Sequence, residues 1–100
     1  MPTPFAEAVL DLVEQIPEGR VAAYGDIAKL LGSGGARAVG TVMARFGSDV
    51  PWWRVVRSDG RPPQCHENLA LEHYRSEGTP LVGSVLTGRR VDLARARWPG

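Results

Sequence analysis

Two segments with helical spacing, separated by only three residues, constrain the fold of this chain most strongly. Apolar side chains recur at helical spacing over residues 25–31 and again over residues 35–46. Between them stands Gly32-Ser33-Gly34, which is typical of a tight turn. Two short helices joined by a glycine-containing turn predict a helix-turn-helix, whose second helix lies in a groove of DNA. An ordinary helical hairpin has the same pattern, so the spacing alone leaves both interpretations open.

The second of these helices carries the side chains that DNA would meet. Arg37 and Arg45 are its two cations, and small residues, among them Ala36 and Gly40, would let it approach a duplex closely. Residues 27–58 hold five basic side chains and one acidic side chain. Such a basic segment is expected of a face that meets phosphates, and it is equally typical of a solvated surface.

The composition indicates one small domain. With 43% hydrophobic and 23% charged residues, the chain can bury a modest core, and we expect a single domain over residues 1–100. It has no apolar run that could span a membrane and no signal-peptide pattern, so we expect a cytoplasmic protein, associated with the nucleoid in a bacterium. One cysteine and two histidines are too few for a structural zinc site, and we expect neither a metal nor a cofactor.

The remaining elements follow from periodicity and from turn-forming residues. We expect helices over residues 4–15 and 67–77, extended segments over residues 21–23 and 51–56, a turn at residues 58–60, a loop over residues 61–66, and two apolar tail segments, 82–86 and 91–93, around a turn near residues 87–88. Together these elements predict an α/β domain that is mainly α, of the winged-helix-like helix-turn-helix type.

Four short motifs occur in order along the first half of the chain. They are Ile16-Pro17-Glu18-Gly19, Ala23-Tyr24-Gly25-Asp26-Ile27-Ala28, Ala36-Arg37-Ala38-Val39-Gly40 and Pro51-Trp52-Trp53-Arg54-Val55-Val56. Over roughly residues 5–78 the chain resembles the C-terminal DNA-binding domain of O6-alkylguanine-DNA alkyltransferases. The signature Pro-Cys-His-Arg-Val of that family stands here with Trp52 and Trp53 in place of cysteine and histidine. Tryptophan in place of the cysteine is the mark of the alkyltransferase-like proteins, which the chain resembles most.

The resemblance implies a protein that binds O6-alkylguanine in duplex DNA by flipping the nucleotide out, and that flags it for nucleotide excision repair. Alkyl transfer needs a thiolate nucleophile, which the family activates through the neighbouring histidine. The indoles of Trp52 and Trp53 supply neither group, so we expect no enzyme. An enzyme built on Cys65 and His66 is a rival interpretation, disfavoured because thiol activation needs an oriented, electropositive site.

The resemblance also assigns roles to individual residues. Arg37 is the finger that fills the gap left by the extruded nucleotide, and Tyr24 helps to rotate its phosphate. The residues expected at the lesion pocket are Trp52, Trp53, Arg54, Val55, Ser58 and Cys65. Arg54 is expected to brace the pocket through backbone hydrogen bonds. Cys65 stands where alkyltransferase-like proteins have an arginine that faces the base, so Gln64 or His66 could supply that contact.

A sequence-specific transcription regulator with the same helix-turn-helix is the alternative function. Beyond Arg37 and Arg45, few side chains of the second helix can read base edges, and the chain leaves little room for a dimerisation surface or an effector domain. We therefore expect a monomer that binds duplex DNA containing O6-alkylguanine. Nucleotide excision repair proteins are the further partners that the resemblance implies, and the preferred size of the alkyl group stays open.

Overall fold

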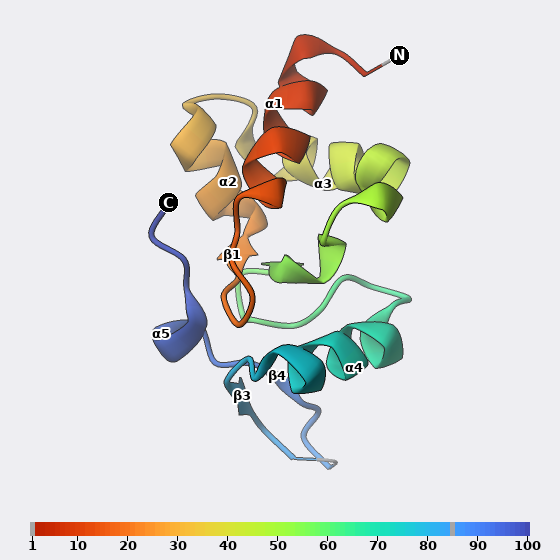
Figure 1. Cartoon of the computed structure of the whole chain (residues 1–100), viewed down its shortest axis with the longest axis vertical. Helices are drawn as coiled ribbons and strands as arrows, with labels where there is room; N and C mark the ends of the chain where they lie inside the picture. Colours follow the sequence, from red (N-terminus) through yellow and green to blue (C-terminus); the bar gives the residue numbers. More distant parts are fainter. Residues whose placement is uncertain (1, 85) are drawn as a thin grey trace.

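The first three helices fold together at one end of the molecule, and the elements that follow fill the other end (Figure 1). The computed structural model describes residues 2–84 and 86–100, so Met1 and Val85, which falls in the expected tail segment 82–86, lie outside the described residues. In chain order the elements are α1 (Pro4–Glu14), β1 (Ala22–Ala23), α2 (Tyr24–Leu31), α3 (Gly35–Phe46), the 3-10 helices η1 (Gly47–Asp49) and η2 (Trp52–Arg54), β2 (Val55–Val56), α4 (Glu67–Glu77), β3 (Leu81–Val82), β4 (Arg90–Val91) and α5 (Leu93–Ala96). The fold is mainly helical with two small sheets, as the sequence predicts.

Helix α1 begins where its sequence provides a cap. The Thr3 hydroxyl oxygen accepts a hydrogen bond from the Ala6 N–H at 3.1 Å, and Pro4 occupies the first helical position, where a missing N–H costs nothing. Val9 and Val13, on the inward face, are completely buried. The predicted amphipathic helix is confirmed and ends one residue earlier than expected.

The turn between α2 and α3 depends on glycine. Gly32 and Gly34 have φ values of 74° and 87°, in the left-handed region that other residues rarely adopt. A Cβ at Gly34 would also collide with the Phe5 ring, so the turn packs closely on α1. At the start of α2, the Asp26 carboxylate accepts a hydrogen bond from the Ala23 N–H at 3.0 Å. Both helices of the predicted pair are confirmed, with α2 starting one residue early.

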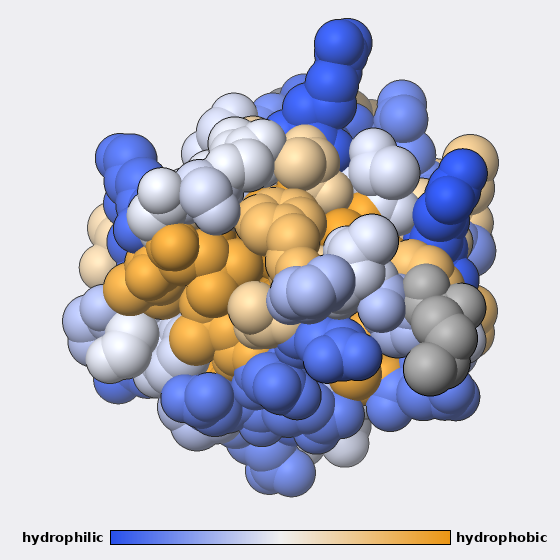
Figure 2. Space-filling view, turned by 90° about the horizontal axis from the view of Figure 1, so that it is seen from above, coloured by the Kyte–Doolittle hydropathy of each residue, from blue (hydrophilic) through white to orange (hydrophobic). Residues whose placement is uncertain are grey.

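These helices do not bury every apolar side chain. The face seen from above, at the end where α1 to α3 lie, carries an apolar area surrounded by hydrophilic side chains (Figure 2). Leu30 of α2 keeps 46% of its surface exposed, although Ile27 of the same helix is completely buried. Helix α2 therefore carries more apolar surface than the core beneath it buries.

A parallel pair of short strands joins the two ends of the molecule. Strand β1 pairs with β2 so that Ala22 lies opposite Val55 and Ala23 lies opposite Val56. Ala22 and Val55 pack into the core under α1 to α3, whereas Val56 packs into a second core with residues of α4 and the C-terminal segment. Both cores therefore share this strand pair.

The C-terminal segment returns to β1 after an antiparallel β3–β4 pair. The Asp92 carboxylate accepts a hydrogen bond from an N–H of α5 at 3.2 Å, which caps this short helix. The Val21 N–H then donates to the Ala96 carbonyl at 3.0 Å, and the Trp98 N–H donates to the Val21 carbonyl at 2.7 Å. These bonds fix the last residues of the segment alongside β1.

The expectation of extended chain over residues 51–56 is wrong in part. Within residues 51–56, the signature residues 52–54 form η2 instead, because Pro51 has ψ near 70° and its carbonyl accepts from the Arg54 N–H at 3.0 Å. Only the two valines that follow are extended and pair with β1. In the tail, Leu93 of the expected apolar segment starts α5, because Asp92 provides an N-cap.

Candidate nucleic-acid interface

Helix α3 presents two rows of side chains away from the core. Arg37 and Arg45 are exposed and lie about two turns apart on the same side of the helix. Ala36, Gly40 and Ala44 form a neighbouring row of small residues at a spacing of four residues. A flat row beside two cations would let a DNA backbone come close to this helix.

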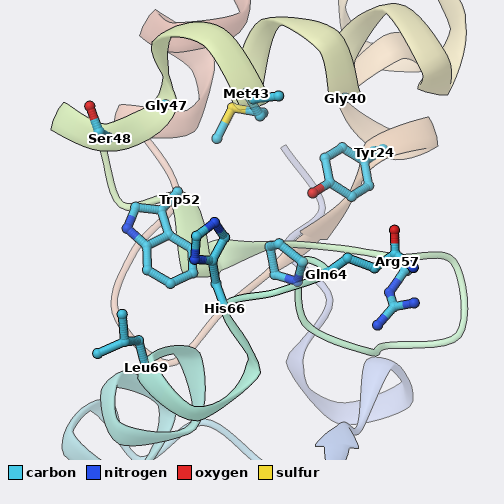
Figure 3. Close-up of a pocket in the computed structure, with 12 residues that line it drawn as sticks. Tyr24, Gly40, Met43, Gly47, Ser48, Trp52, Arg57, Gln64, His66 and Leu69 are labelled. Carbon is cyan, nitrogen blue, oxygen red and sulfur yellow. The ribbon is translucent and has the colours of Figure 1, made fainter.

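A cavity of about 580 Å³ lies against this row (Figure 3). Helices α3 and η1 form one wall, and η2, the loop after β2 and helix α4 form the opposite wall. The lining residues are Tyr24, Gly40, Met43, Ala44, Gly47, Ser48, Trp52, Arg57, Pro63, Gln64, His66 and Leu69. The cavity therefore opens next to the helix that the sequence predicts to contact DNA, and its volume is in the range of small-molecule sites.

Trp52 supplies the largest flat surface of the cavity. Its ring lies 5.5 Å from the His66 ring at an interplanar angle of 57°, and it meets the Trp53 and His73 rings edge-on, with centroids 5.7 Å and 6.0 Å away. Three rings thus pack around the indole. An indole face of this kind gives a planar ring an apolar surface on which to stack.

The other signature residues lie behind this wall and do not line the cavity. Trp53 stacks on His73 with centroids 3.6 Å apart and rings nearly parallel, while its carbonyl accepts a hydrogen bond from the Tyr74 hydroxyl at 2.6 Å. Val55 is completely buried in the core. Arg54 donates to the Ile16 carbonyl at 2.9 Å, which is a backbone contact of the expected kind.

Glu77, at the end of α4, holds these residues together and was missed by the sequence reasoning. Its carboxylate accepts hydrogen bonds from Arg54 Nε at 3.1 Å and Nη2 at 2.8 Å, from Trp53 Nε1 at 2.8 Å and from the Gly19 N–H at 3.3 Å. The Glu77 and Arg54 side chains are only 8% and 13% exposed. Burial raises the pKa of Glu77, but the hydrogen bonds from Arg54, Trp53 and Gly19 outweigh it, so the pKa lies below its ordinary value.

Tyr24 and Arg57 close one side of the cavity (Figure 3). Burial raises the pKa of the Tyr24 hydroxyl, although the nearby Arg57 guanidinium opposes the shift. At neutral pH the phenol therefore stays protonated and can donate a hydrogen bond. The Arg57 Nε donates to the Pro62 carbonyl at 3.0 Å, which ties the loop after β2 to the cavity wall. Sequence reasoning identified Tyr24 but did not single out Arg57.

The loop after β2 brings some of the expected residues to the cavity and leaves others out. Gln64 and His66 line the cavity. Cys65 between them is exposed, has a φ of 71° and is absent from the lining. Ser58 lies in a neighbouring cleft instead. Of the residues assigned to the lesion pocket, only Trp52 forms part of the cavity wall.

Other classes of site find no support in the part of the chain that the structure describes. Among residues 2–84 and 86–100, no three histidine, cysteine or acidic side chains gather as metal ligands would. In the same residues, each helix is too short or too polar to cross a bilayer.

Comparison with known proteins identifies the family of this chain. The model of the 6-O-methylguanine DNA methyltransferase DNA-binding domain matches residues 4–78. The chain belongs to this family. Among its relatives, the Escherichia coli DNA base-flipping protein is 40% identical over 99 residues, which cover 94% of this chain and 74% of that protein. The Schizosaccharomyces pombe alkyltransferase-like protein 1 is 32% identical and is covered over 94% of both chains.

Solved structures of family members share the fold. The crystal structure of the S. pombe alkyltransferase-like protein in complex with damaged DNA containing O6-carboxymethylguanine has a TM-score of 0.82, with 30% identity over 98% of both chains. The Mycobacterium tuberculosis O6-methylguanine methyltransferase has a TM-score of 0.62, with 28% identity over 86% of this chain and 55% of that chain. The predicted resemblance and the predicted fold are confirmed.

Proposed function

We propose that this protein binds duplex DNA through α3 and takes an O6-alkylated guanine, rotated out of the helix, into the cavity walled by Trp52. The observation that carries the proposal is the position of this cavity directly beside the row of small residues on α3. A relative named as a DNA base-flipping protein and a homologous complex with O6-carboxymethylguanine DNA support it. Extrusion costs a few kcal/mol and is cheapest for a damaged base, which favours lesions.

Each part of the interface has a proposed role. Arg37, exposed on α3, enters the base stack where the nucleotide has left, while Arg45 and the small residues Ala36 and Gly40 meet the backbone. The Tyr24 phenol donates to a phosphate of the rotated nucleotide. Inside the cavity the guanine ring stacks on Trp52, a use of an aromatic surface that tolerates different substituents on the base.

Recognition of the base edge falls to the loop after β2. Because Cys65 is absent from the lining, we assign the contact to Gln64 and His66, whose side chains both reach the cavity (Figure 3). Gln64 offers a donor and an acceptor, and the two ring nitrogens of His66 can take part in hydrogen bonds. Trp53, Arg54 and Val55 then act from outside the cavity, by holding its wall, and Ser58 lines the neighbouring cleft.

We propose further that the protein performs no chemistry on the lesion. The two ring systems of Trp52 and Trp53 lie where the family signature has its cysteine and histidine, and neither indole is a nucleophile. Cys65, the lone thiol of the chain, is exposed and lies outside the cavity. A protein that holds the alkylated base without repairing it would serve to mark the site.

The wider context of the proposal depends on the family resemblance. We propose that residues 1–100 act as one domain, which is supported by the strand pair shared between the two cores. The protein works as a monomer on chromosomal DNA, in the cytoplasm and at the nucleoid of a bacterium, and nucleotide excision repair proteins act on the marked site. The resemblance to alkyltransferase-like proteins supports these last points.

The proposal predicts a preference for damaged DNA. The protein is expected to bind a duplex with one O6-methylguanine at least several-fold more tightly than the matched guanine duplex, because the cavity receives the extruded base. Competition gel shifts with the two duplexes measure this ratio, and intact mass of the protein after incubation checks for transfer. Equal affinities would point to the transcription-regulator alternative, and a mass gain of one methyl group would contradict the absence of chemistry.

Replacing Trp52 with cysteine is expected not to create an efficient transferase. The new thiol would lack an activating base, because Trp53 stands beside it. The double change Trp52→Cys with Trp53→His is the matched comparison, since the ring at position 53 already donates to Glu77 and a histidine there would have an orienting carboxylate. Single-turnover methyl transfer from O6-methylguanine DNA is measured for both. Rapid transfer by the single variant would show that the cavity activates a thiol without a base.

A further inference from the structure

A second cleft, of about 470 Å³, lies beside the first cavity, and its walls are basic. The lining residues are Ala23, Tyr24, Gly25, Asp26, Lys29, Ala36, Arg57, Ser58 and Arg97. Three of these side chains are cationic and one is anionic. The cleft shares Tyr24 and Arg57 with the first cavity and reaches the first turn of α3 at Ala36. It therefore lies next to both the cavity and the N-terminal end of α3.

Arg97 comes to this cleft from the far end of the chain. A parallel β-bridge joins the Arg97 backbone to Val21. The N–H of the next residue, Trp98, donates a hydrogen bond to the Val21 carbonyl at 2.7 Å. The Arg97 Nε donates to Asp26 Oδ2 at 3.0 Å, yet 51% of its side chain is exposed. Residue 97 lies beyond residues 4–78, the part that matches the family domain. The cleft is therefore completed by a residue beyond the range that matches the family model.

The charges in the cleft favour an anion. The single carboxylate, Asp26, is already engaged, since its Oδ2 accepts from both the Ala23 N–H and Arg97. Lys29 is exposed and forms no ion pair with any residue among 2–84 and 86–100. The cleft also lies at the N-terminus of α2, where the helix dipole favours negative charge. A phosphate suits this setting, because a guanidinium can bind two of its oxygens at once.

We propose that this cleft binds a phosphate of the DNA backbone beside the extruded nucleotide, and that Arg97 and Lys29 are its contacts. The inference rests on the proposed binding of DNA through α3. A base held in the first cavity is joined through its sugar to a phosphate, and Tyr24 and Arg57 line both spaces. The base and its phosphate would therefore occupy adjoining parts of one continuous site.

The variant Arg97→Ala tests the phosphate contact through salt dependence. Binding to a duplex with one O6-methylguanine is measured by fluorescence anisotropy at several salt concentrations. Losing one phosphate contact should reduce the slope of log affinity against log salt by about one and weaken binding roughly three- to tenfold. Arg95→Ala is the matched control, because Arg95 is exposed on α5 and absent from the cleft lining. An unchanged slope for Arg97→Ala, or an equal loss in both variants, would overturn the proposal.

The variant Asp26→Asn tests whether Arg97 contacts a phosphate or only stabilises α2 through its ion pair with Asp26. Asparagine keeps an oxygen for the Ala23 N–H but ends the ion pair with Arg97 and removes a negative charge from the cleft. We expect affinity for DNA equal to or above that of the unaltered protein. A loss as large as that of Arg97→Ala would mean that the ion pair only holds α2 in place, and the proposal would fail.

Two further measurements identify the source of the phosphate. They also distinguish a failure of this inference from a failure of the proposed function. If the cleft binds free phosphate instead, inorganic phosphate would bind at Arg97. The slope of log DNA affinity against log salt would then be unchanged in the Arg97→Ala variant, and the proposal would be overturned. The lesion preference of the unaltered protein is measured separately, as the ratio of its affinities for O6-methylguanine and guanine duplexes. Equal affinities for the two duplexes would refute the proposed function. The salt dependence of DNA binding by the Arg97→Ala variant would still show whether the cleft binds a backbone phosphate.

Discussion

Replacing Glu77 with alanine is expected to lower the free energy of unfolding by about 3–5 kcal/mol, because it leaves a buried cation without its partner. Arg54 would lose two hydrogen bonds to the carboxylate, and Trp53 would lose the acceptor of its indole N–H. The Arg54 side chain is only 13% exposed, so water reaches it poorly. Urea unfolding followed by circular dichroism measures the change.

A matched control comes from the same helix. Glu72 of α4 is exposed, and its replacement by alanine should change stability by no more than about 0.5 kcal/mol. Glu77→Gln keeps one oxygen as an acceptor, so it should cost less than Glu77→Ala. A loss below about 1 kcal/mol for Glu77→Ala would show that the Arg54 guanidinium finds another partner or reaches solvent.

The same carboxylate should make stability depend on pH in the acid range. Because the pKa of Glu77 is lowered in the folded protein, its contribution is complete above the pKa of the unfolded chain. The contribution is lost as pH falls through the lower folded-state pKa. The Glu77→Gln variant should therefore show a flatter decline of stability in acid than the unaltered protein.

Replacing Arg37 with alanine is expected to weaken DNA binding by about 1–3 kcal/mol and to reduce base extrusion most of all. An extruded nucleotide leaves a gap in the stack and an unpaired partner base, and both are costly unless a side chain fills the space. Arg37 is exposed near the start of α3, where a long side chain can enter the duplex while helix N–H groups face phosphate. A 2-aminopurine at the lesion position reports extrusion by its fluorescence.

Arg45→Ala is the control for this experiment. Arg45 carries the same charge on the same face but lies in the last turn of α3. Its loss should cost less and should act mainly through salt-dependent attraction to phosphates. If Arg37→Ala binds and flips as well as the unaltered protein while Arg45→Ala fails, the finger assignment is wrong and the helix docks differently.

The helices of this fold could be predicted because local sequence decides them. Gly32 and Gly34 stop α2 and start α3 through backbone angles that other residues rarely adopt, and Thr3 caps α1 through a hydrogen bond within one turn. The 3-10 helix η2 was missed because apolar residues after a proline fit an extended segment equally well. The cap of α5 was a readable signal, since Asp92 directly precedes helix-forming residues.

The candidate site was less predictable, because its parts meet only in the folded chain. Trp52 and Tyr24 were found through motifs, but Glu77 lies 24 residues from Trp53 and its role depends on how α4 packs. Leu69, which has helical spacing, is 55% exposed and lines the cavity, so periodicity alone would assign it to a core. Arg57 and Arg97 face the same cleft from positions that no local pattern connects.

The indole that walls the cavity also gives the protein an optical property. Trp52 lies against His66 at the cavity, whereas Trp53 is stacked on His73 behind the wall and Trp98 packs on the core under α1 to α3. A guanine ring stacked on Trp52 would quench the emission of that indole alone. With Trp53 and Trp98 changed to phenylalanine, the remaining fluorescence would follow the arrival and departure of a base in real time, without any label on the DNA.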